Sequence, residues 1–246
     1  MNANSVAVIG FSTQERNVLK GVFELTSRRP PSFTQFDAEL GSEPDLFLVD
    51  ASNEQYVHEV LGVIVTRPVP VVLVGESSYG TPYPLMKRPI KWVKLLKLLE
   101  SSVTVTQPGA DARKVDSVLV VDDSLPVRKF MEAQLMPFGF DVTFAASGEE
   151  AVQFSTQKHH TCVFLDVMLP GMDGYQVCKS IKRKKHEGKP TAVVMLTGKT
   201  SPFDKIRATM AGCDAYLTKP VDEEKLLEVI SKFIPKRGHA DAPQSS

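Results

Sequence analysis

Apolar and polar positions alternate in regular blocks along the second half of the chain. Short continuous apolar runs, as in 118–121, are followed by segments in which apolar residues recur every three or four positions. The first pattern is typical of a strand buried on both faces and the second of an amphipathic helix. The pattern predicts strands at 118–121, 140–144, 162–165, 191–196 and 215–217, with helices from Ser124 to Leu135, from Ser147 to Lys158, and at 175–185, 202–211 and 222–233. Five such units in succession predict a parallel sheet with helices on both faces.

The first half of the chain begins with the same pattern. The segment 5–23, SVAVIGFSTQERNVLKGVF, aligns without a gap on 117–135, SVLVVDDSLPVRKFMEAQL. A strand-like run ending at Asp50 and another near Val72 continue the likeness, so we interpret the chain as a divergent tandem repeat. In this first copy only about ten residues join the second strand to the third, and similarly few join the fourth to the fifth. Because a parallel crossover needs a dozen residues or more, we expect its second and fourth helices to be reduced or lost.

These patterns divide the chain into four parts. We expect a first lobe at 1–101, a linker at 102–116, a second lobe at 117–235 and a disordered polar tail at 236–246. The linker lacks sustained periodicity and contains a Pro-Gly pair. The expected fold class is α/β, with two flavodoxin-like (βα)5 lobes, the first of them shortened.

The composition narrows the function classes. Lys+Arg and Asp+Glu balance at 29 each, so net charge gives no general attraction to nucleic acid or to an anionic membrane. No apolar run approaches the roughly 20 residues of a membrane span, and we expect a cytoplasmic protein with neither partner. The basic run at 181–189 is interpreted as a solvated helix end. The three cysteines, Cys162, Cys178 and Cys213, are interpreted as core residues in a reducing compartment.

Polar residues follow four of the expected strands of the second lobe. Asp122 and Asp123 follow the first strand, Asp166 the third, Thr197 the fourth, and Lys219, with a proline after it, the fifth. Because these strand ends meet in one crevice of an open parallel sheet, the residues are expected to lie together. Three crowded carboxylates repel one another, and Mg²⁺ relieves that repulsion. A nearby ammonium and a hydroxyl suit an incoming phosphoryl group.

Each of these residues also has an ordinary structural interpretation. Asp122 and Asp123 could cap the next helix, and Thr197 could be a turn hydroxyl. Tyr216 could be an aromatic side chain at the edge of the core, and Lys219 could simply leave a strand. Only their joint presence around one aspartate favours the functional interpretation.

The second lobe resembles the response-regulator receiver family of two-component signalling. The likeness rests on VLVVDDS (118–124), FLDVMLPGMDG (164–174), MLTG (195–198) and AYLTKP (215–220). It implies that Asp166 is the phosphoacceptor and that Lys219 pairs with the phosphoryl oxygens. It also implies that Thr197 moves towards the phosphoryl group and that Tyr216 turns inward with it. The implied Mg²⁺ ligands are Asp123 directly, Asp122 mainly through water, Asp166, and the Met168 backbone carbonyl. The peptide bond between Lys219 and its proline is expected to be cis.

We expect a response regulator without a DNA-binding or enzymatic output domain, because the sequence after the last predicted helix is too short and polar to form one. Its phosphoryl donor would be a sensor histidine kinase or a histidine phosphotransfer protein, and its output would be contact with an unidentified downstream protein; a homodimer is left open. The alternative is an enzyme such as a haloacid-dehalogenase-like phosphatase, whose pattern is DxDx[TV] after the first strand. Here that strand ends in DDS, and FLDVM lacks a second aspartate two positions on. We therefore do not expect an enzyme.

The first lobe lacks most of these residues, and we expect a degenerate pseudo-receiver that never carries phosphate. Gly10 and Phe11 stand at the positions of the acidic pair, and Gly75 stands at the position of the threonine. Asp50 matches the phosphoacceptor. Arg88 takes the place of the lysine, with the preceding lysine as a possible substitute, and is expected to pair with Asp50.

Overall fold

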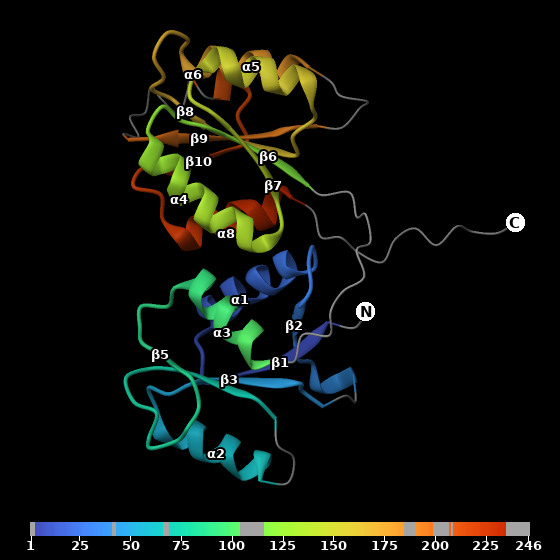
Figure 1. Cartoon of the computed structure of the whole chain (residues 1–246), viewed down its shortest axis with the longest axis vertical. Helices are drawn as coiled ribbons and strands as arrows, with labels where there is room; N and C mark the ends of the chain where they lie inside the picture. The colour runs from blue at the N-terminus through green and yellow to red at the C-terminus, as the bar shows by residue number, and fades with distance from the viewer. Residues whose placement is uncertain are drawn as a thin grey trace, which may run out of the picture. The chain divides into compact units, whose positions relative to one another are not determined.

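The computed structural model describes residues 3–40, 43–65, 69–103, 116–184, 190–198, 207 and 209–234 (Figure 1). The chain divides into two compact units between residues 112 and 113. Most of the predicted linker, from 104 to 115, lies outside the described residues, as does the predicted tail. Among the described helices, none combines the length and the apolar character needed to cross a membrane.

The second lobe is built on five parallel strands in the order β10-β9-β8-β6-β7. The strands are β6 (Ser117–Val121), β7 (Asp141–Ala145), β8 (Cys162–Asp166), β9 (Ala192–Thr197) and β10 (Ala215–Thr218). The central strands β6 and β8 are buried throughout, as their continuous apolar sequences require. The predicted α/β fold with a parallel sheet is confirmed.

Helices cover both faces of this sheet. In Figure 1, α5 (Gly148–Gln157) and α6 (Gly174–Arg183) lie on one face, and α4 (Leu125–Leu135) and α8 (Glu223–Phe233) lie on the other. A short 3-10 turn, η2 (Met136–Phe138), ends α4 ahead of Gly139. Most of the predicted helix at 202–211 lies outside the described residues, but Arg207 and residues 209–211 are helical.

The first lobe has the same strand order, β2-β1-β3-β4-β5. Its strands are β1 (Asn4–Ile9), β2 (Phe33–Gln35), β3 (Leu46–Asp50), β4 (Val71–Val74) and β5 (Leu85–Met86). Helices α1 (Thr13–Thr26) and α3 (Trp92–Ser102) share one face, and α2 (Glu54–Ile64) lies on the other (Figure 1). The apolar face of α3 packs in the core, where four of its side chains are buried: Trp92, Leu95, Leu96 and Leu99.

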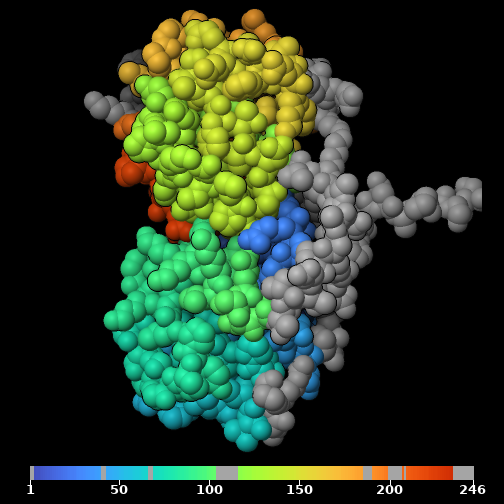
Figure 2. Space-filling view, in the orientation of Figure 1, coloured from blue at the N-terminus to red at the C-terminus, as the bar shows by residue number. Residues whose placement is uncertain are grey.

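Two crossover helices of the first lobe are reduced, as the spacing predicted. Among the described residues between β2 and β3 there is only a 3-10 turn, η1 (Ala38–Leu40), and the described loop at 75–84 between β4 and β5 contains no helix. Phe36 and Tyr83 pack against the apolar core on the α2 side. Together with α3, the segment from this loop onward forms much of the visible face of the lobe (Figure 2, teal to green).

Two of the three cysteines are buried in the second lobe. Cys162 lies in β8 and Cys178 in α6, and burial raises the pKa of each thiol to about 12. Both are therefore protonated core residues at neutral pH, as predicted. Cys213 is only half-buried.

Candidate functional site

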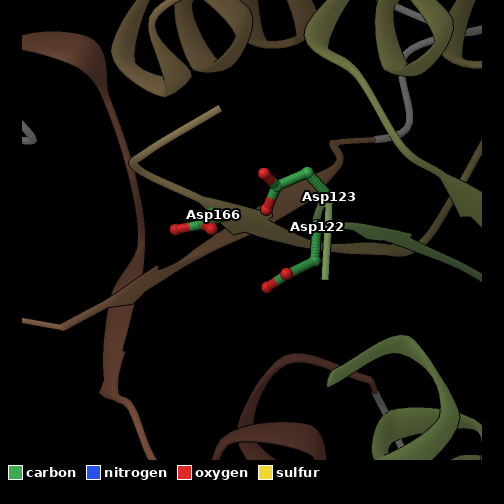
Figure 3. Close-up of side chains that lie close together, drawn as sticks. All are labelled: Asp122, Asp123 and Asp166. Carbon is green, nitrogen blue, oxygen red and sulfur yellow. The ribbon is translucent and has the colours of Figure 1, made fainter. Parts of the chain in front are cut away.

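Three aspartates meet at the carboxyl end of the second sheet (Figure 3). Asp122 and Asp123 follow β6, and Asp166 is the last residue of β8. One carboxylate oxygen of each lies within 4.8 Å of the other two. Asp122 is fully buried and Asp166 is 4 % exposed, whereas Asp123 is exposed to solvent. The predicted convergence of these residues, which we call the acid cluster, is confirmed.

Lys219 brings one positive charge into the acid cluster. Its Nζ lies 2.6 Å from Oδ2 of Asp122 and 2.6 Å from Oδ2 of Asp166. Burial alone would lower the pKa of Lys219, but its bonds to the two carboxylates outweigh burial and raise the pKa above the ordinary value. The predicted cis peptide bond between Lys219 and Pro220 is present.

Asp166 is a carboxylate in a partly desolvated position. Burial raises its pKa, and the charge of Asp122 adds to this effect, whereas hydrogen bonds from Lys219 and from the Met168 N–H oppose it. The Met168 N–H donates to Oδ1 over 3.1 Å, so one oxygen is oriented by the following loop and the other by Lys219. Both bonds hold the carboxylate in place at the strand end.

The composition of the acid cluster suits a small divalent cation. Three carboxylates face one ammonium, which leaves two negative charges to balance. All three acids offer hard oxygen ligands, the type that Mg²⁺ prefers. Because Asp123 is exposed while the other two acids are buried, the cluster is open to solvent on one side. These residues therefore fit Mg²⁺, as the sequence predicted.

The acid pair has a structural role as well as a chemical one. Oδ1 of Asp122 accepts a hydrogen bond from the Ser124 N–H over 2.9 Å, while Oδ2 faces Lys219. Ser124 occupies the N-cap position of α4, but its own side chain makes no capping bond. Asp122 closes the turn that leads into α4 and caps none of the N–H groups of the helix itself, so this residue combines a turn role with its place in the cluster.

Thr197 lies on β9, the strand next to that of Asp166, and Tyr216 lies on β10, one strand further out. Thr197 ends β9 and is buried, and the Lys219 N–H donates to its carbonyl over 2.8 Å. Tyr216 lies in β10 beside Met195. Burial raises the pKa of Tyr216 to about 12, and a hydrogen bond with the Cys213 side chain adds to the rise. That contact was not predicted, because nothing in the sequence pattern marks a cysteine three positions before a tyrosine.

Two further residues shape the site. A Cβ on Gly174 would overlap the carbonyl oxygen of Asp166, so only glycine lets α6 begin this close to the acceptor strand. Arg128 donates from its guanidinium to the Asp122 carbonyl over 2.5 Å. Sequence reasoning assigned Arg128 no role, although the repeat alignment pairs it with Arg16, which donates to the Phe11 carbonyl over 3.0 Å in the first lobe.

The sheet register identifies the matching positions of the first lobe. Met86 pairs with Val74 as Leu217 pairs with Leu196. Two residues further on, Arg88 therefore corresponds to Lys219, and the alternative residue, Lys87, does not. The Arg88 guanidinium lies 2.8 Å from Oδ2 of Asp50, which confirms the predicted pair.

Comparison with known proteins gives three findings. The family model for the response regulator receiver domain matches residues 118–231. The chain is 39 % identical over 125 residues to protein PilG of Pseudomonas aeruginosa, a match that covers 51 % of this chain and 92 % of PilG. Two solved structures are each similar to about half of the chain. Chemotaxis protein CheY4 of Vibrio cholerae has 30 % identity and a TM-score of 0.47, with 49 % of this chain and 100 % of CheY4 covered. The receiver domain of the Pseudomonas aeruginosa sensor histidine kinase PA1611, described with a magnesium ion coordinated in its active-site cleft, has 26 % identity and a TM-score of 0.45, with 49 % and 98 % covered.

Proposed function

Since the chain belongs to the response regulator receiver family of two-component signalling, we propose that its second lobe accepts a phosphoryl group on Asp166 with the help of Mg²⁺. The observation that carries this proposal is the acid cluster with Lys219 between its two buried members. A nucleophile, a cation site and a phosphoryl-binding ammonium would thereby lie together at one edge of the sheet.

The proposed reaction is a displacement at phosphorus. An oxygen of Asp166 forms a bond to phosphorus while the bond from phosphorus to the donor's imidazole nitrogen breaks, and the released nitrogen takes a proton from solvent. The acid cluster and the Met168 carbonyl would hold Mg²⁺, which would offset the negative charge that otherwise repels the phosphoryl group. Lys219 then exchanges its contact with Asp166 for one with a phosphoryl oxygen.

The signal would pass from Asp166 to the outer strand. In this proposal the Thr197 hydroxyl binds the phosphoryl group, and Tyr216 moves inward as Thr197 moves. Tyr216 lies on β10, which pairs with β9, the strand that ends in Thr197. A movement of Thr197 would therefore be passed directly to β10. Output would be a protein contact made by the face around β10 and α8. The donor would be a sensor histidine kinase or a histidine phosphotransfer protein.

The first lobe would take no part in phosphoryl transfer, and we propose that it is a pseudo-receiver. It keeps the sheet but lacks both acids of the pair and the threonine, so its Asp50 has no cation site beside it. Its use would be to dock a partner or a second copy of the chain.

The intact mass of the protein after incubation with acetyl phosphate and Mg²⁺ tests the proposal. The parent protein should gain one phosphoryl group, and EDTA should abolish the gain. Asp166→Asn should lose it, whereas the matched variant of the first lobe, Asp50→Asn, should keep it. An unchanged yield in Asp166→Asn would show that the acceptor lies elsewhere, and a lost gain in Asp50→Asn would show that the first lobe also reacts.

A further inference from the structure

Three charged side chains of the first lobe meet where the second lobe has its acid cluster. The Arg88 guanidinium pairs with Oδ2 of Asp50 over 2.8 Å and, through its other nitrogen, with Oε1 of Glu15. The exposed fractions of these side chains are 31 % for Arg88, 13 % for Asp50 and 21 % for Glu15. We call Glu15, Asp50 and Arg88 the ionic triad.

The ionic triad joins three separate elements of the lobe. Glu15 belongs to the first turn of α1, Asp50 ends β3, and Arg88 follows β5. Glu15 also accepts from the Ser12 N–H over 3.0 Å, within a capping box at the start of α1. The second oxygen of Asp50 accepts from the Ser52 N–H over 2.9 Å. Both carboxylates are therefore bound at both oxygens, and one guanidinium links the two.

The space around the triad is filled by the lobe itself. At Gly10, which aligns with Asp122, an added Cβ would overlap the ring of Tyr56. At Gly75, which aligns with Thr197, an added Cβ would lie 2.7 Å from the Ala51 carbonyl carbon. These two positions, which supply polar side chains in the second lobe, are here closed by an aromatic ring and by backbone.

The loop after β4 closes the same edge. The Tyr79 hydroxyl donates to the Ala51 carbonyl over 3.1 Å, and Tyr79 has a φ of 50°, an unfavourable value for a tyrosine. The loop is therefore held down on the residue that follows Asp50. No mobile hydroxyl and no acidic cation site remain at these described positions.

We propose that Arg88 is a built-in counter-ion that holds the first lobe in one arrangement, so that this lobe does not switch. In the function proposed for the second lobe, Lys219 and an exchangeable cation would balance the acids, and their rearrangement would be the switch. In the first lobe the Arg88 guanidinium stands in for both the lysine and the cation. A guanidinium stays charged in proteins and binds two carboxylates in a fixed geometry. The lobe would then present the same surface whatever the state of Asp166. This inference does not depend on the role proposed for Asp166.

Trp92 offers a direct test in the full-length chain. It is the single tryptophan, and it is buried in the first lobe, so its fluorescence during urea unfolding reports on that lobe alone. Arg88→Met should raise the unfolding equilibrium constant of the lobe roughly tenfold or more, because two partly buried carboxylates lose their partner. Arg88→Lys should fall between the parent and Arg88→Met, because an ammonium cannot bridge two carboxylates in the same way. The matched control is Arg29→Met, which removes a 2.7 Å pair with Glu100 in the same lobe and should have a smaller effect.

A second substitution separates charge from packing. In the Arg88→Met background, Asp50→Asn should restore part of the lost stability, since it removes one uncompensated carboxylate. Failure to restore any stability, or an Arg88→Met effect no larger than that of Arg29→Met, would overturn the proposal.

Hydrogen exchange completes the test. Mg²⁺ with beryllofluoride, a stand-in for the phosphoryl group, should leave exchange at residues 10–15, 50–53 and 75–88 of the parent protein unchanged. A change of twofold or more in these segments would show that the lobe switches and would overturn the proposal. If hydrogen exchange in the second lobe also stayed unchanged, this would count against the function proposed for Asp166. The stability comparison between the parent and the Arg88 variants would remain valid.

Discussion

Lys219 places its ammonium nitrogen 2.6 Å from an oxygen of Asp166 and at the same distance from an oxygen of Asp122. One positive charge therefore bridges the two buried acids of the site. A phosphoryl group on Asp166 would bring new anionic oxygens within reach of that ammonium and would compete with the carboxylates for it. The lysine is thus suited to sense the modification rather than to perform it.

The first prediction concerns Lys219 itself. Lys219→Met should still be phosphorylated on Asp166 by acetyl phosphate with Mg²⁺, because the nucleophile and the cation ligands remain. Its conformational response should be lost, since no ammonium follows the phosphoryl group. Hydrogen exchange across residues 197–220, with and without beryllofluoride, measures this response. Lys225→Met, which changes an exposed lysine of α8, should behave like the parent. A full response in Lys219→Met would refute this role.

The second prediction concerns the cation. Mg²⁺ should raise the thermal midpoint of the second lobe, because binding to the folded state relieves the excess negative charge of the acid cluster. At ten times the dissociation constant the gain is about 1.4 kcal/mol, or roughly 4–8 °C for a domain of this class. Calorimetry with and without Mg²⁺ measures it. Asp123→Asn should reduce the shift, whereas Asp141→Asn, at an exposed position on β7, should not. Equal shifts in both variants would place the cation elsewhere.

The third prediction concerns the pH dependence of the first lobe. Burial tends to raise the pKa of Glu15, but hydrogen bonds from Arg88 and Ser12 outweigh burial and lower it. A lowered folded-state pKa means that the stabilisation is fully present above the ordinary glutamate pKa and is lost as the pH falls through the folded-state value. Urea unfolding followed by Trp92 fluorescence should show that Glu15→Gln costs about 1 kcal/mol at pH 7. This difference should shrink as the pH falls below about 4.5. A difference that stays constant down to pH 3 would exclude the ionic contribution.

The fourth prediction concerns the closed strand end of the first lobe. Gly75→Thr restores the side chain found in the second lobe, but its Cβ would lie 2.7 Å from the Ala51 carbonyl carbon. The lobe should lose roughly 1–3 kcal/mol of stability, because the clash is with backbone that cannot simply rotate away. Gly62→Ala is the matched control, because nothing lies within 4 Å of its added methyl and it sits within α2. That control should be neutral or stabilising by up to about 1 kcal/mol. A stable Gly75→Thr lobe would mean that the strand end is open.

The fold and the acid cluster could be predicted because both depend on local patterns. Continuous apolar runs marked the strands, and parallel strand ends necessarily bring Asp122 and Asp166 to one edge. Other features needed tertiary information. The sequence placed Arg88 at the lysine position but left Lys87 as a possible substitute, and the pairing of Met86 with Val74 excludes Lys87.

Side-chain contacts across elements were the hardest to foresee. Ser124 stands at the N-cap of α4 without a capping bond from its side chain, and its N–H donates to Asp122, whose carboxylate reaches this turn while also facing Lys219. The Arg128 contact with the Asp122 carbonyl depends on which way a long side chain folds back along α4, and composition and periodicity do not determine this.

Arg16 and Arg128 make the same kind of contact in the two lobes, each with a carbonyl of the turn that follows the first strand. This contact persists in a lobe that has lost the acidic pair, so it belongs to the architecture and not to the signalling chemistry. The first lobe can thus serve as an internal control for the second. A substitution made at equivalent positions of both lobes can be compared within one molecule, at the same concentration and in the same buffer. Such paired substitutions distinguish what a receiver needs in order to fold from what it needs in order to respond.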